Sequence, residues 1–118
     1  MAKFFERGDI VRVNLNPVAG HEMQGDMRPC LVLSTAAFSR MAGVSFVTPI
    51  TQGGNYARLA GFAVSLMGTG CKTQGVAIVS ATRPIDLAAR GARKIEAAPD
   101  FVVNEAVAKF VGLFEAGA

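Results

Sequence analysis

The residues best suited to chemistry in this 118-residue chain gather between Gly20 and Pro29, in the sequence GHEMQGDMRP. His21 is the only histidine of the chain, and the ordinary histidine pKa of ~6.5 suits proton transfer near neutral pH. Glu22 is a second candidate base if burial strips part of its hydration. Glycines on this segment indicate a loop, a common place for catalytic groups. The alternative interpretation is that His21 and Glu22 are ordinary solvated loop side chains.

Arg28 directly precedes Pro29, which biases it toward an extended conformation at the start of the apolar segment CLVLS, residues 30–34. A strand would therefore position its guanidinium rigidly. A planar guanidinium can make two parallel hydrogen bonds to phosphate oxygens, which a lysine cannot reproduce. Judged by spacing alone, an ion pair with Glu22 or Asp26 explains Arg28 equally well.

Thr51 and Gln52 are predicted to end another strand, just before the turn sequence QGGN. Their hydroxyl and amide groups, with the backbone N–H groups of the turn, can orient a phosphate or a ribose. Ordinary capping of a strand end is the alternative. Further basic residues either add a cationic surface or only keep the domain soluble: Arg58, Lys72, Arg83, Arg90, Arg93 and Lys94.

The elements that must position these residues are mostly strands. Alternating apolar and polar residues predict strands at 10–16 and 61–66, and the apolar run 30–34 predicts a central strand. Further strands are expected at 44–51 and 75–81. Residues 36–41 fit one helical turn. Pro99 is predicted in the first turn of a helix whose apolar residues, from Val103 to Phe114, form the face packed on the sheet. About six short strands with glycine-rich turns and no βαβ alternation favour a mostly β fold, a small closed or nearly closed barrel with peripheral helices.

Composition limits the class of protein. The length predicts a single domain spanning 1–118, and 51% hydrophobic against 18% charged residues opposes disorder. No apolar run is long enough for a membrane helix or resembles a signal peptide, so we expect a cytoplasmic protein. Cys30 and Cys71 are 41 positions apart and are expected to be reduced thiols. With one histidine and no clustered carboxylates, we expect no metal and no cofactor. The net charge of +3 permits a nucleic acid partner without requiring one.

Four blocks, in this order along nearly the whole chain, resemble the MazF/PemK toxin family, particularly its Kid- and ChpB-like members. They are FERGDIV, NPVAGHEMQGDMRPCLVLS, PITQGGNYARLAGFAVSL and RPIDLAARGARKIE. The resemblance implies an SH3-like barrel of the CcdB/PemK type with a C-terminal helix. It also implies a homodimer that cleaves single-stranded RNA, such as mRNA, without a metal, and that is neutralised by a cognate antitoxin protein.

The resemblance also assigns site residues. His21, Glu22, Arg28 and Thr51 match positions that the family uses for catalysis or RNA binding. Further RNA contacts are expected from the following residues: Gln24, Ser34, Gln52, Asn55, Ser80 and Arg83. One departure stands out, because relatives commonly carry an Asp-Gln or Asn-Gln pair, preceded in PemK-like members by an arginine, where this chain has Ile78, Ser80 and Ala81. Ser80 is then at most a weaker hydrogen-bonding substitute.

The resemblance therefore predicts a toxin that acts as an endoribonuclease through transesterification by the ribose 2′-hydroxyl. Glu22 or His21 would take the proton, Arg28 would stabilise negative charge and Thr51 would position the substrate. One alternative is a catalytically weakened family member that binds only RNA or the antitoxin. Another is a CcdB-like poison of DNA gyrase, although the GHE and RP residues are those of the RNA-cleaving branch.

Overall fold

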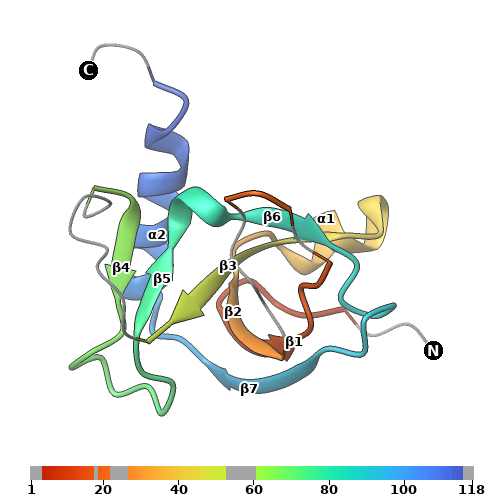
Figure 1. The fold of residues 1–118 in the computed structure, drawn as a ribbon, viewed down its shortest axis with the longest axis horizontal. Coiled ribbons are helices and arrows are strands. Elements are labelled where there is room, and N and C mark those ends of the chain that lie inside the picture. Colours follow the sequence, from red (N-terminus) through yellow and green to blue (C-terminus); the bar gives the residue numbers. More distant parts are fainter. Residues whose placement is uncertain (1–3, 18, 22–26, 53–60, 116–118) are drawn as a thin grey trace.

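The computed structural model describes residues 4–17, 19–21, 27–52 and 61–115, and in these ranges the chain forms a curled antiparallel sheet with two α-helices (Figure 1). The elements in chain order are β1 (Asp9–Val13), β2 (Arg28–Val32), α1 (Ala36–Ala42), β3 (Ser45–Thr51), β4 (Ala63–Ser65), β5 (Val76–Ile78), the 3-10 turn η2 (Val79–Ala81), β6 (Arg83–Ile85), β7 (Arg93–Ala97) and α2 (Asp100–Gly112). Neighbouring strands follow the order β4-β5-β3-β2-β1-β7, and β6 pairs with β3. The mostly β class with a C-terminal helix is confirmed.

Some element predictions were wrong in detail. The predicted strand 75–81 is two elements, because the chain leaves the sheet at η2 after Ile78. The sequence analysis assigned no strand to β6 or β7, although β6 pairs with β3 and β7 pairs with β1. Pro99 is the N-cap of α2 and not part of its first turn.

The break at η2 is accommodated by two threonine hydroxyls. One edge of β3 pairs first with β6, through residues 45–47, and then with β5, through residues 50 and 51. Between these two ladders lie the hydroxyls of Thr48 and Thr82, whose oxygens are 2.6 Å apart. The Thr82 hydroxyl donates to the Val79 carbonyl at 2.6 Å, so its single proton is used and the fully buried Thr48 must donate to Thr82. These bonds satisfy both hydroxyls at the interruption, and the Val79 carbonyl also accepts from the Thr82 N–H at 3.1 Å.

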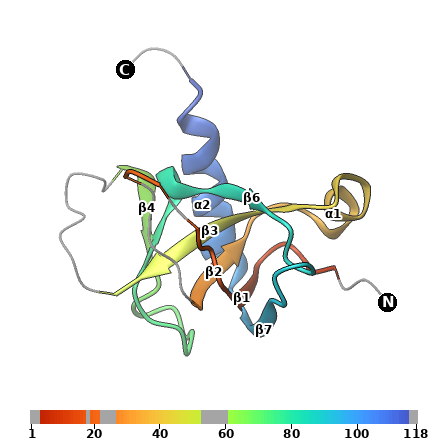
Figure 2. The same cartoon turned by 45° about the vertical axis from the view of Figure 1, so that its right-hand side comes forward.

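Apolar residues pack on both sides of the sheet. On one side α2 covers the strands through Val102, Val103 and Ala106 (Figure 2), within a cluster that includes Ile10, Leu31 and Ile50. The second cluster consists of Phe5, Val11, Val13, Leu15, Cys30, Val32, Val47, Ile85 and Leu87. α1 lies at the side of the molecule opposite β4 in both views. Neither α-helix in the described ranges has the length and hydrophobicity of a membrane span.

Gly75 allows the start of β5 to approach the end of β3. Its φ is +122°, and a Cβ built on it would lie 2.4 Å from the Thr51 carbonyl oxygen. Residues other than glycine rarely adopt this backbone conformation, and position 75 has no room for a side chain. The position of Thr51 therefore depends on a glycine at 75.

We predict that Gly75→Ala lowers the free energy of unfolding by about 3 kcal/mol, because it adds backbone strain and a clash with Thr51. Chemical denaturation measures this change. Gly112→Ala is the matched control, since position 112 lies in α2 with open space around it and alanine favours a helix. Equal stability of the Gly75→Ala variant and the parent protein would contradict the prediction.

Candidate functional site

A cleft of about 450 Å³ opens where β2 begins and β3 ends. Its described lining consists of Arg12, Arg28, Pro29, Ile50, Thr51, Gln52, Lys72, Thr73, Gln74 and Ile95. The three ionisable side chains of this lining are all cations, and the other polar groups are hydroxyls and amides. This cleft, called the basic cleft below, is suited to an anion with several hydrogen-bond acceptors.

Arg28 is fixed at the mouth of the basic cleft as the first residue of β2. Its side chain is half-buried, and Nη1 donates a hydrogen bond to the Ile50 carbonyl oxygen at 3.2 Å. In the β2–β3 ladder Cys30 faces Pro49, so continuing that register by two residues places Arg28 opposite Thr51 on the same face. A guanidinium and a hydroxyl thus meet at one end of the sheet, held by strand geometry.

A second arginine, Arg83 on β6, lies outside the described lining of the basic cleft. Arg83 pairs with Val47, which faces Val32, so Arg83 and Arg28 share a face of the sheet. Between them Cys30 is fully buried, and burial raises the pKa of its thiol to about 12 although the charges of Arg28 and Arg83 act to lower it. Cys30 therefore remains a neutral thiol, and its Sγ donates to the Arg28 carbonyl at 3.7 Å.

Glu96 on β7 holds the loop that forms one wall of the basic cleft. Its carboxylate accepts hydrogen bonds from the backbone N–H groups of Lys72 at 2.9 Å and Thr73 at 2.7 Å. Burial acts to raise the pKa of Glu96, but bonds from the Thr73 side chain and these two N–H groups, with the Lys72 charge, lower it overall. Gln52 also binds this loop, because its Nε2 donates a hydrogen bond to the Gln74 carbonyl at 3.3 Å.

The structure brings only part of the predicted site together. Arg28, Thr51 and Gln52 all line the basic cleft. Ser34 follows the opposite end of β2, and its Oγ accepts a hydrogen bond from the Phe46 N–H at 2.9 Å, so it lies away from the cleft. His21 is exposed and does not belong to the described lining.

The remaining predicted positions fall into two groups. Ser80 is exposed on η2, between the buried Ile78 and the half-buried Ala81, and none of these three belongs to the described lining of the basic cleft. Glu22, Gln24 and Asn55 lie outside the described residues. Within the described ranges there is no group of three or more His, Cys, Asp or Glu side chains placed to bind a metal ion.

Several residues of the site were missed by the sequence analysis. Arg12 was not singled out within its predicted strand, residues 10–16, and Lys72 was counted only among the further basic residues. Thr73, Gln74 and Glu96 were not considered at all. In the sequence IVRV, residues 10–13, Arg12 is the one polar residue, and this could have marked it as a candidate. The partners of Glu96 lie 23 and 24 residues away in sequence, so no local pattern could have identified its role.

Comparison with known proteins identifies related sequences. The family model described as PemK-like, MazF-like toxin of type II toxin-antitoxin system matches residues 6–113. Endoribonuclease PemK of Escherichia coli is 48% identical over 104 residues, which is 88% of this chain and 77% of that protein. Endoribonuclease toxin ChpB of Escherichia coli strain K12 is 50% identical over 111 residues, 94% of this chain and 95% of that protein.

Solved structures resemble the fold over the same length. The crystal structure of MazF (Form-I) from Deinococcus radiodurans has a TM-score of 0.80 and 33% sequence identity, and covers 94% of this chain and 96% of its own. The MazE-MazF complex (Form-III) from the same organism has a TM-score of 0.77 and 30% identity with the same coverage.

We predict that the Lys72 and Thr73 amides report the ionisation of Glu96. Because the folded-state pKa of Glu96 is lowered, its stabilising contribution is present above the unfolded-state value of about 4.3 and is lost as the pH falls through the folded-state pKa. Amide NMR shifts of Lys72 and Thr73 should therefore titrate with a midpoint below the pKa of an ordinary glutamate. Glu96→Gln should abolish this titration.

Glu105→Gln is the matched control, because Glu105 pairs with Lys109 on α2 and should leave the two amide titrations unchanged. An amide midpoint at or above the value of an ordinary glutamate, or a titration that survives in Glu96→Gln, contradicts the assignment.

Proposed function

The chain belongs to the family of PemK-like, MazF-like toxins of type II toxin–antitoxin systems, and on this premise we propose that it is an endoribonuclease that cleaves single-stranded RNA. The observation that carries the proposal is Arg28, held half-buried between β2 and β3 and opposite Thr51 in a cleft with a cationic lining. An RNA phosphodiester is the anion that such a site fits, because it offers charge and several acceptor oxygens.

The proposed reaction is transesterification within the RNA. The ribose 2′-oxygen bonds to the adjacent phosphorus while the bond from phosphorus to the 5′-oxygen of the next nucleotide breaks, which leaves a 2′,3′-cyclic phosphate and a 5′-hydroxyl. The nucleophile comes from the substrate, so no metal-bound water is needed. A DNA strand lacks the 2′-hydroxyl and should not be cleaved.

Arg28 has the central role in this mechanism. Negative charge builds on the phosphorane oxygens, and a guanidinium fixed in advance stabilises this charge without reorganising during the reaction. The Thr51 hydroxyl, opposite Arg28, orients the phosphate. His21 or Glu22 accepts the 2′-proton, and Arg28 or His21 supplies the proton of the leaving oxygen.

The residues Ile78, Ser80 and Ala81 favour a second candidate function. They give this stretch neither a carboxylate nor a base, and η2 exposes Ser80 to solvent. A chain of this kind could bind RNA or its antitoxin and cleave slowly. The rate measured on unstructured RNA distinguishes the two candidates, because a binding module would retain RNA affinity without producing cleaved ends.

The proposal includes the partners of the family. One similar structure is a MazE-MazF complex, and a cognate antitoxin with acidic segments would suit the basic cleft of this chain. We further propose a homodimer in the cytoplasm, where both mRNA and the antitoxin are present.

We predict that Arg28→Ala slows RNA cleavage about 10²- to 10³-fold, because it removes the donor to the developing charge. Arg28→Lys should recover only part of the loss, since lysine keeps the charge but not the planar pair of donors. Cleavage is followed on a long unstructured RNA, with the product ends tested for cyclic phosphate.

Arg40→Ala on α1 removes the same charge away from the cleft and should cleave as the parent does. Thermal unfolding of each variant shows whether it is folded. If folded Arg28→Ala cleaves at the parental rate, the role assigned to Arg28 is wrong.

A further inference from the structure

We propose that Arg12 and Arg93 extend the basic cleft into a phosphate-binding row that holds the RNA backbone beside the cleavage site. This inference rests on the proposed function, and it assigns a binding role to Arg93, which does not belong to the described lining of the cleft. The ligand class is the phosphodiester backbone of a single strand, independent of base sequence.

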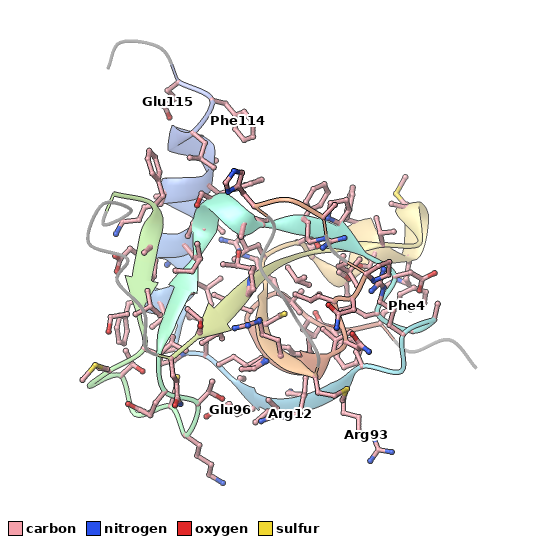
Figure 3. The ribbon with its side chains drawn as sticks, in the orientation of Figure 1. Phe4, Arg12, Arg93, Glu96, Phe114 and Glu115 are labelled. Atoms are coloured by element: carbon pink, nitrogen blue, oxygen red, sulfur yellow. The ribbon has the colours of Figure 1, made fainter. Side chains whose placement is uncertain are left out.

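Arginines occupy the same end of three neighbouring strands. Arg28 begins β2, Arg12 on β1 faces Pro29 of β2, and Arg93 on β7 faces Arg12. Arg12 and Arg93 thus share the sheet face of Pro29, while Arg28 starts from the other face and joins Arg12 in the lining of the basic cleft at the ends of these strands. Figure 3 shows Arg12 and Arg93 along the same edge of the molecule. Because neighbouring strands are ~4.8 Å apart, the row from Thr51 on β3 to Arg93 on β7 spans roughly 14 Å. It is longer than one phosphate, so a polyanion fits it better than a single small anion.

The carboxylates of β1 and β7 are engaged elsewhere. These two strands carry only Asp9 and Glu96. Asp9 pairs with Lys94 at 3.2 Å and accepts from the Glu6 N–H at 2.9 Å, while Glu96 holds the loop at Lys72 and Thr73.

Arg12 and Arg93 therefore remain as two like charges facing each other. Both are exposed, and neither forms an ion pair with a carboxylate in the part of the chain that the structure describes. Within the described residues, the Arg12 side chain donates one hydrogen bond, from Nη1 to the Met27 carbonyl at 3.2 Å, which directs it toward the start of β2. Like charges directly opposite in a strand pair destabilise it, and a bound phosphate removes this repulsion.

The test measures RNA affinity as a function of RNA length. The probes are fluorescent 2′-O-methyl oligonucleotides of about three and about twelve nucleotides, which lack the nucleophile and cannot be cleaved. We expect Arg93→Gln to weaken binding of the longer probe about fivefold and to leave the shorter probe unchanged. The slope of log affinity against log salt for the longer probe should become shallower by about 0.7, as for one lost phosphate contact.

Arg40→Gln is the matched control, because it removes the same charge from α1, which lies apart from β7 in Figures 1 and 2. Equal losses in Arg93→Gln and Arg40→Gln, or no loss in Arg93→Gln at either length, overturn the proposal. The result is independent of catalysis: if the parent protein cleaves no RNA, the proposed function fails, but the length-dependent loss of binding still supports the row.

Discussion

The site depends on one constraint, the fixed position of the Arg28 guanidinium between β2 and β3. Two features of the structure hold it: the β2 strand that begins at Arg28 and the hydrogen bond from Nη1 to the Ile50 carbonyl. A long cationic side chain ordinarily samples many rotamers, and ordering it costs conformational entropy. In the folded protein the Arg28 side chain is already ordered, so the charge is in place before a phosphate binds.

Other parts of the fold also shape the end of the sheet where β2 begins and β3 ends. The interruption at η2 lets β3 pair with β6 near its start and with β5 at its end, which places Thr51 against Gly75. Glu96 then fixes the opposite wall of the basic cleft from β7. Elements distant in sequence thus determine the shape of the site, while α2 stabilises the sheet from one side.

The sequence predicted those features that depend on local patterns. Alternation and apolar runs located β1, β2, β3 and α2, and the Arg-Pro pair correctly placed Arg28 at the start of a strand. The break after Ile78 was not predictable in this way, since VAIVSA fits a continuous strand and the interruption shows only in the tertiary pairing, where β3 changes partner from β5 to β6. The role of Glu96 could not be predicted for a similar reason, because its hydrogen-bond partners, Lys72 and Thr73, lie in a loop distant in sequence. The resemblance supplied the residue roles, and those of His21, Glu22 and Ser80 stay predictions.

The most direct measurement is a crystal structure of this chain with an RNA whose ribose at the cleavage site lacks the 2′-hydroxyl. The account predicts that the uncleaved phosphate lies in the basic cleft, with two guanidinium nitrogens of Arg28 at about 2.7–2.9 Å from its oxygens and the Thr51 hydroxyl beside it. An RNA bound elsewhere on the protein, with Arg28 touching no phosphate, would contradict the account.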